Sequence, residues 1–174
     1  AQPNLITYNC IIDACVKADN IALASELFNE LLDSSSYLKP DLITYGTLIK
    51  GLCRQKDIET AYYYLNLMQS FGIKPDEALF NLILECCHAT NYYDLGLQIF
   101  EMMNQLRVPP SNITFSILIK LHSRARKIQK VIEVIDIMKM QKVKPTLVIF
   151  TNIVQACFKA NQFDKAIEIV GILE

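Results

Sequence analysis

The sequence predicts an all-α protein, a right-handed α-solenoid superhelix of stacked helix-turn-helix hairpins. First, two segments are nearly identical: LITYNCII at residues 5–12 and LITYGTLI at residues 42–49. Second, prolines recur at an interval of 37 and then 35 residues, and they are Pro3, Pro40, Pro75, Pro110 and Pro145. Third, glycine is scarce, with five in 174 residues. A fixed period of this length is typical of stacked helical repeats, each covering the apolar faces of its neighbours.

The first helix of each repeat is predicted by its apolar pattern. We number each repeat from the second residue after its proline, so that position 1 is Leu5, Leu42, Glu77, Asn112 or Leu147. Positions 7 and 8 are always aliphatic, and position 4 is always aromatic: Tyr8, Tyr45, Phe80, Phe115 and Phe150. At 100° per residue, positions 4, 7, 8 and 11 lie on one side of a helix. We therefore expect a first helix from about position 2 to position 14, buried along this stripe.

A second helix is expected after a polar break in each repeat. Position 20 of this helix is small in four repeats and valine in the fourth: Ala24, Ala61, Gly96, Val131 and Ala166. The predicted repeats form one array, with residues 5–41, 42–76, 77–111, 112–146 and 147–174, the last incomplete. We expect the two extra residues of the first repeat at residues 34–37. Pro3-Asn4 resembles the end of a preceding repeat, and the fifth repeat stops at position 28. We therefore expect this sequence to be a fragment of a longer array.

Composition restricts the function classes. The chain is 52% hydrophobic and nearly balanced in charge, with 17 basic and 18 acidic residues. A transmembrane helix needs about 18 to 20 consecutive apolar residues, and the sequence contains no such run. We therefore expect no membrane among its partners. The six cysteines form no CxxC pair, and with two histidines they predict no metal site. We expect reduced cysteines that pack as small apolar residues.

The opposite face of the first helix carries a second pattern. Positions 2, 5, 9 and 13 lie within a stripe about 80° wide. Position 13 is basic in four repeats: Lys17, Arg54, Arg124 and Lys159. Position 2 is aliphatic throughout: Ile6, Ile43, Ala78, Ile113 and Val148. Position 5 is small and mostly polar: Asn9, Gly46, Asn81, Ser116 and Thr151. Apolar plates, hydrogen-bonding tips and cations are the groups that bind a single-stranded nucleic acid.

These features resemble pentatricopeptide repeat proteins. The resemblance rests on the 35-residue period, the Thr-Tyr-Asn opening, the small position 20 and the segments Lys39-Pro40-Asp41 and Lys74-Pro75-Asp76. It covers nearly the whole chain. Tetratricopeptide repeats differ, because they have a 34-residue period and another Trp/Leu/Gly/Tyr pattern. The resemblance implies a single-stranded RNA-binding protein that reads one base per repeat.

The resemblance also implies roles for particular positions. Position 5 and the last residue of each repeat, called position 35 after its place in a 35-residue repeat, together select the base. Position 2 sandwiches the base, and the position 13 cation contacts phosphate. The implied base-reading pairs are Asn9 with Asp41, Gly46 with Asp76, Asn81 with Ser111, Ser116 with Thr146, and Thr151 with a residue after Glu174. The implied order, 5′ to 3′, is uracil, guanine, a pyrimidine and two purines. Repeat three departs from the pattern, because Ala78 is a small plate and Ala89 replaces the cation.

Two functions remain open. The first is an RNA-binding module in organellar RNA processing, stability, editing or translation, in a mitochondrion or plastid. Its transit peptide would lie outside this fragment, and proteins of an RNA-processing complex would be further partners. The second is a protein-interaction scaffold within a larger complex. The net charge of −1 counts against RNA binding. No enzyme, cofactor or small-molecule substrate is predicted, because no nucleophile–base constellation or phosphate loop is present.

The basic run at residues 124–130 and His122 each allow two interpretations. The run from Arg124 to Lys130 is either a solvated turn or a phosphate contact through Arg126, Lys127 and Lys130. His122 occupies position 11 of the buried stripe, which predicts a hydrogen-bonded core residue rather than a ligand.

Overall fold

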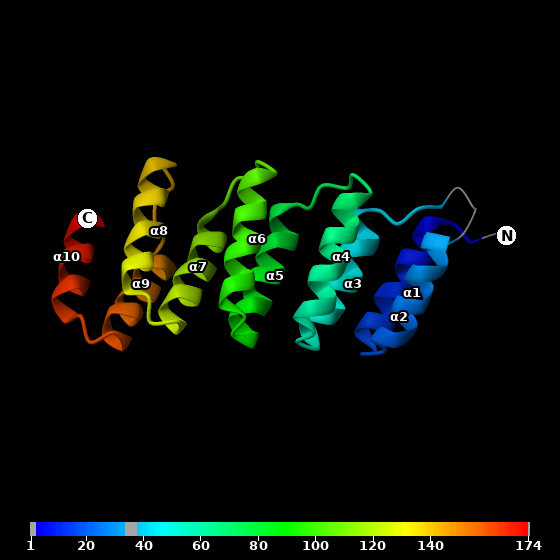
Figure 1. Ribbon diagram of the computed structural model, residues 1–174, viewed down its shortest axis with the longest axis horizontal. Coiled ribbons are helices and arrows are strands. Elements are labelled where there is room, and N and C mark those ends of the chain that lie inside the picture. The colour runs from blue at the N-terminus through cyan, green and yellow to red at the C-terminus, as the bar shows by residue number, and fades with distance from the viewer. Residues whose placement is uncertain (1–2, 34–37, 174) are drawn as a thin grey trace. The chain divides into compact units, whose positions relative to one another are not determined.

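A computed structural model describes residues 3–33 and 38–173, and these residues form ten α-helices and no strand (Figure 1). The all-α fold class is thereby confirmed. The chain divides into two compact units, Ala1–Cys86 (unit 1) and Cys87–Glu174 (unit 2), which are described separately. The expected lengthening of the first repeat at residues 34–37 lies outside the described residues.

Unit 1 consists of two helical hairpins and the start of a third. Its helices are α1 (Leu5–Lys17), α2 (Ile21–Asp33), α3 (Leu42–Arg54), α4 (Ile58–Ser70) and the first part of α5 (Glu77–Thr90). The first and second helices of each hairpin pack together, and α1 also packs along α3. Successive first helices therefore lie side by side, as stacked repeats require.

Unit 2 repeats this arrangement. It contains the end of α5, then α6 (Tyr93–Gln105), α7 (Asn112–Arg124), α8 (Ile128–Met140), α9 (Leu147–Lys159) and α10 (Phe163–Leu173). Helices α7 and α9 make the most extensive contact. Helix α8 packs against α7, and α10 packs against α9. The first helices are again direct neighbours.

Local capping determines where the helices begin. The Asn4, Asp41 and Ser111 side chains accept hydrogen bonds from backbone amides in the first turns of α1, α3 and α7. Position 35 is thus the N-cap of the next repeat, so each first helix begins at position 1 rather than position 2. The turn of each hairpin contains one residue with a positive φ near 60°. From the first hairpin to the fifth, these residues are Asp19, Lys56, Asn91, Arg126 and Asn161. These left-handed residues stop the first helix at position 13, or 14 in α5.

The core follows the apolar stripe. Tyr45, Phe80 and Phe115 at position 4 are fully buried, and every position 20 residue is buried. A β-carbon on Gly96 would lie 2.7 Å from a Leu121 methyl, so this helix contact requires a small residue. Ile11 is 44% exposed, because α1 packs only against α2 and α3 among the described helices.

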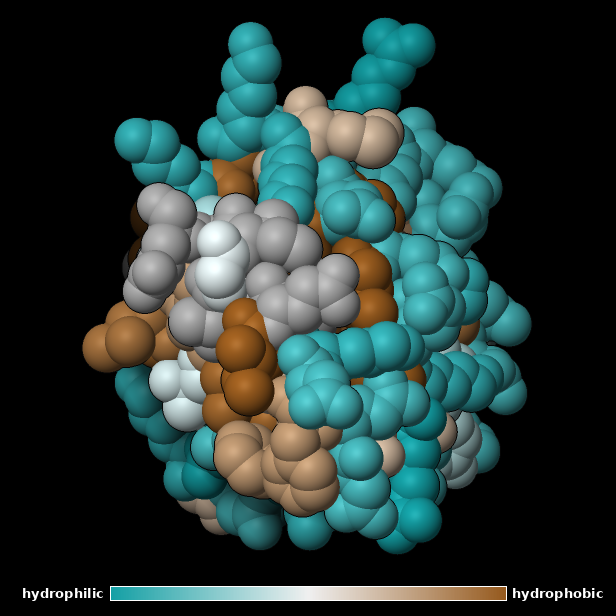
Figure 2. All heavy atoms as spheres, turned by 90° about the vertical axis from the view of Figure 1, so that its left-hand side faces the viewer, coloured by the Kyte–Doolittle hydropathy of each residue, from teal (hydrophilic) through white to brown (hydrophobic). Residues whose placement is uncertain are grey.

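Two expectations about composition can be compared with the structure. All six cysteines are free thiols; four are buried, Cys53 is half-buried and Cys10 is exposed. Within residues 3–33 and 38–173, none of the helices has the length and hydropathy of a membrane span. Apolar residues also reach the surface of the last hairpin, among hydrophilic ones (Figure 2). Phe158, Phe163 and Ile167 are exposed there, and the two phenylalanine rings meet edge to face at 5.1 Å.

Candidate nucleic-acid interface

Position 2 presents apolar side chains to solvent in both units. Ile6 and Ile43 of unit 1 are 72% and 63% exposed, and Ile113 and Val148 of unit 2 are 64% and 57% exposed. Ala78 at the start of α5 is exposed as well. Each lies in the first turn of a first helix, on the side opposite the buried stripe. These side chains stabilise no core, so they are available to pack against a flat ligand.

The fold brings Asn9 and Asp41 together, the first of the predicted base-reading pairs. The Asn9 amide nitrogen lies 3.4 Å from a carboxylate oxygen of Asp41, although the residues are 32 positions apart. The Thr44 hydroxyl donates to the Asn9 amide oxygen at 2.7 Å, and Asp41 caps α3 by accepting from the Thr44 amide. Asn9 and Asp41 are half-buried, with their tips fixed in one place. This arrangement presents an oriented amide and a carboxylate beside Ile6 and Ile43.

Asp41 keeps its negative charge at this site. Partial burial raises the pKa of its carboxyl, but hydrogen bonds from Thr44, Asn9 and the Ile43 amide together hold that pKa below its ordinary value. Asp41 is therefore a hydrogen-bond acceptor at neutral pH.

The second and third pairs differ from the first. Asp76 accepts a hydrogen bond from the Leu79 amide at 2.8 Å, and Gly46 offers no side chain opposite it. Asn81 is buried; its amide nitrogen donates to Glu77, and its amide oxygen has no hydrogen-bond partner. An unsatisfied buried acceptor is costly, and a ligand N–H group could satisfy it. Ser111 is half-buried and caps α7.

The remaining predicted base-reading residues lie in unit 2. Ser116 is buried, and its hydroxyl accepts a hydrogen bond from the Asn152 amide at 2.7 Å. Thr151 is exposed, and its hydroxyl donates to the Leu147 carbonyl one turn earlier. Thr146 is exposed and occupies the N-cap of α9 without a capping side-chain bond. The structure therefore leaves Thr151 and Thr146 accessible, whereas Ser116 is engaged between α7 and α9.

The position 13 cations all lie at the end of a first helix, and all are exposed. Lys17 forms an ion pair with Asp13, one turn earlier. Arg54 donates to the Val16 carbonyl at 3.4 Å. Arg124 donates to the His88 carbonyl at 2.8 Å. Both arginines thus bind the position 12 carbonyl of the preceding first helix, a stabilising cation contact at a helix C-terminus. The periodic pattern of cations gave no indication of this second role.

We expect Arg124→Ala to have two separable effects. It removes the bond to the His88 carbonyl, which lowers the free energy of unfolding by about 1 kcal/mol. If Arg124 also contacts phosphate, RNA affinity falls alike for all sequences and the slope of log K against log salt becomes shallower by about 0.7. Urea unfolding and salt titrations measure the two effects. An unchanged slope would assign Arg124 to the helix end alone.

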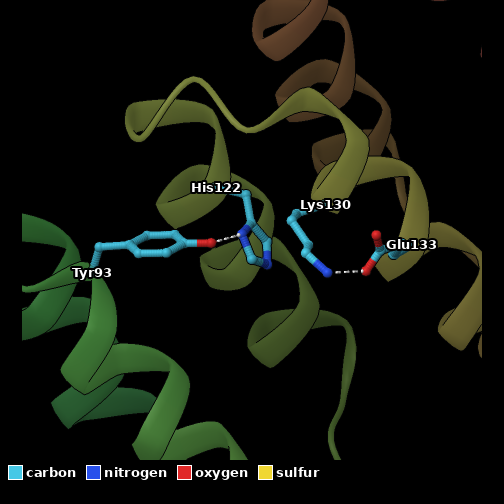
Figure 3. A network of polar contacts seen from close by, with 4 residues as sticks. All are labelled: Tyr93, His122, Lys130 and Glu133. Atoms are coloured by element: carbon cyan, nitrogen blue, oxygen red, sulfur yellow. Dashed lines mark hydrogen bonds and ion pairs between the residues drawn. The ribbon is translucent and has the colours of Figure 1, made fainter.

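The basic run is partly engaged within unit 2 (Figure 3). The Lys127 ammonium lies 4.0 Å from the centre of the Tyr93 ring, and Lys130 forms an ion pair with Glu133 at 2.6 Å. The Tyr93 hydroxyl lies 2.8 Å from His122 Nδ1. Burial, with a smaller contribution from Lys130, lowers the pKa of His122 to about 4. His122 is thus a neutral, hydrogen-bonded core residue, as predicted.

The stacked hairpins define a helical-repeat protein, and comparison with known families identifies the family. The PPR repeat family model matches residues 3–54 and 40–88, and the model of the pentacotripeptide-repeat region of PRORP matches residues 79–173. The second match alone covers more than half of the chain. The chain belongs to the pentatricopeptide repeat family.

Among the described residues, no group of three or more His, Cys, Asp or Glu side chains is placed to hold a metal ion.

Similar proteins agree with this assignment. A chloroplastic pentatricopeptide repeat-containing protein of Arabidopsis thaliana is 32% identical over 98 residues, covering 56% of this chain and 11% of that protein. The crystal structure of PPR10 from maize superposes with a TM-score of 0.85 at 23% identity, over 99% of this chain and 24% of that one. PPR10 in complex with an 18-nucleotide psaJ RNA element gives 0.76 at 25% identity, with 99% and 25% coverage. The chain spans less than a fifth of the curated relatives it first matches.

Proposed function

We propose that this chain is a module that binds single-stranded RNA and reads one base per repeat. The observation that carries the proposal is the pairing of Asn9 with Asp41 directly beside two exposed isoleucines. A scaffold for protein partners has no need of an oriented amide–carboxylate pair in this position. A nucleobase needs both a flat apolar surface and directed polar groups along its edge.

Each group has a definite task in this proposal. The position 2 side chains pack on the faces of the bases, where apolar contact excludes water. The position 5 and position 35 side chains exchange hydrogen bonds with the base edge, and Lys17, Arg54, Arg124 and Lys159 neutralise phosphates. In this proposal the repeats that start at residues 5, 42, 77, 112 and 147 each contribute such a set, except that Ala89 replaces the cation in repeat three. The expected base order is uracil, guanine, a pyrimidine and two purines.

The similar proteins support this proposal. PPR10 has been crystallised with an RNA element, and the Arabidopsis relative carries a chloroplast designation. We infer that the chain acts on organellar RNA, in a plastid or mitochondrion, with other proteins of an RNA-processing complex as further partners. Within this proposal the chain binds RNA and performs no catalysis. Any catalytic step would belong to another part of a longer protein.

The proposal is tested at Asn9. Replacing Asn9 with threonine exchanges an amide for a hydroxyl, so we expect the preferred base at one position to change from uracil to a purine. Four RNAs that differ only at that base, each titrated against the 174-residue chain, measure the preference. The matched control is Asn29→Thr, at an exposed site on the second helix α2, which should leave base preference unchanged.

Salt dependence distinguishes RNA binding from a protein scaffold. Four phosphate contacts to a single strand predict a slope of log K against log salt near −3, since each contributes about −0.7. Asn9→Thr should leave that slope unchanged, because Asn9 reads a base and not a phosphate. Absence of RNA binding for the original chain at low salt would refute the proposal and favour the scaffold.

A further inference from the structure

A pocket of about 340 Å³ lies between α3 and the start of α5 in unit 1. Ile43 and Ala78, the exposed plates of repeats two and three, line it together with Gly46 and Asp76. Lys50, at position 9 of repeat two, lines the pocket as well. The family resemblance gives roles to positions 2, 5, 13 and 35, and none to position 9. The pocket is therefore the place where the second base would lie, and it contains one cation that has no assigned task.

Gly46 leaves this pocket open. A β-carbon built on Gly46 would meet no atom within 4 Å, so no neighbour requires glycine there. Glycine inside a helix is unfavourable relative to alanine, and Gly46 lies in the second turn of α3. The missing side chain provides room for a larger base, and it also removes the usual position 5 reader. Another side chain must then supply the selective contact.

Lys50 is positioned to supply that contact. It follows Gly46 by four residues, so both lie on the same face of α3. Its side chain is exposed, and Asp13, the acidic residue of α1 that also lines the pocket, is ion-paired with Lys17. Asp76 is held by the Leu79 amide at 2.8 Å, and a carboxylate retains further acceptor capacity. The pocket thus combines an exposed ammonium donor with a carboxylate acceptor that is anchored at the start of α5.

We propose that Lys50 is the specificity-determining residue of repeat two and that it selects guanine. This inference rests on the proposed RNA-binding function. Guanine presents O6 and N7 as acceptors, which lysine recognises, and N1–H and N2–H₂ as adjacent donors for the Asp76 carboxylate. Adenine and cytosine offer the carboxylate only one amino group, and uracil is smaller and presents two carbonyl oxygens. Guanine alone offers Lys50 two acceptors and Asp76 two adjacent donors, and it fills the room left by Gly46.

The experiment uses the 174-residue chain and four labelled RNAs with the core UNCAA, in which N is each of the four bases. We expect the original chain to prefer guanine at N. Lys50→Gln should lower affinity for the guanine RNA about tenfold and change the other three less than twofold. Lys50→Arg should retain the preference, because arginine also donates to O6 and N7. Lys139→Gln, an equal loss of charge at an exposed site on α8, should leave the preference intact.

A second variant tests the role of the open space. Gly46→Asn restores a polar side chain at position 5, and it should abolish the guanine preference by narrowing the pocket. If Lys50→Gln weakens all four RNAs alike and flattens the salt slope, Lys50 is a phosphate contact and the inference is wrong. If N is read without preference while Asn9→Thr still changes the first base, only this inference fails. If no RNA binds, the proposed function fails with it.

Discussion

Replacing both Ile6 and Ile43 with alanine is expected to weaken RNA binding about thirtyfold. The two side chains flank the first base in the proposed complex, and each substitution removes apolar atoms worth roughly 0.8 kcal/mol per buried methylene. Because a base covers only part of each side chain, the pair contributes about 2 kcal/mol, which corresponds to the thirtyfold loss. Fluorescence anisotropy with a labelled single-stranded RNA measures the affinity.

The fold should tolerate this double substitution. Ile6 and Ile43 are 72% and 63% exposed, so their truncation leaves the core intact and changes stability by less than about 0.5 kcal/mol each. The matched control is Met140→Ala with Leu147→Ala, since both side chains are about four-fifths exposed and neither occupies position 2. If control and test variants lose the same affinity, the loss reflects general apolar contact, and position 2 has no special role.

The second large effect is a loss of stability in acid that arises from His122. Burial and the neighbouring Lys130 lower its pKa to about 4, whereas an unfolded chain titrates near 6.5. Between these values the unfolded state binds a proton that the folded state does not. Stability is therefore fully present above pH 6.5 and decreases as pH falls toward 4, by up to about 3 kcal/mol.

The pair of substitutions His122→Leu and Tyr93→Phe should remove this contribution. Leucine occupies the equivalent position 11 in repeat two, as buried Leu52, and phenylalanine avoids leaving the Tyr93 hydroxyl without its partner. Urea unfolding at pH 7, 6, 5 and 4.5 compares the two chains, and acid effects of the carboxylates cancel in the difference. Parallel pH profiles for the two proteins would show that His122 is already protonated or hydrated in the folded state.

Much of the fold was predictable because helical geometry is local. Position on a helix depends only on the spacing along the chain, so the aromatic position 4 and the small position 20 predicted which sides are buried. The same spacing predicted that Ile6, Ile43, Ile113 and Val148 lie away from the core, and all four are exposed. It also predicted four cations at the ends of first helices. The helix starts were misplaced by one residue, because the N-cap role of position 35 was not recognised.

Contacts between helices could not be predicted in this way. The Asn9–Asp41, Ser116–Asn152 and Tyr93–His122 hydrogen bonds each join residues 29 to 36 positions apart. Of these, only Asn9 with Asp41 was expected, from the family resemblance and not from helical spacing. The arginine contacts of Arg54 and Arg124 have the same character. Their existence depends on how far one helix is displaced along the next, which is determined by side-chain packing across the interface.

The sequence by itself determined the repeat, the buried stripe and the composition of the opposite face, because periodicity sets the direction of every side chain about its helix axis. The tertiary structure decided which of those side chains hold one another and which remain available. Asn9 and Asp41 became an oriented pair, Ser116 became engaged, and Gly46 opened a pocket beside Lys50. The physical reason is that hydrogen bonds and pockets depend on distances between helices, and those distances are set only when the apolar faces pack.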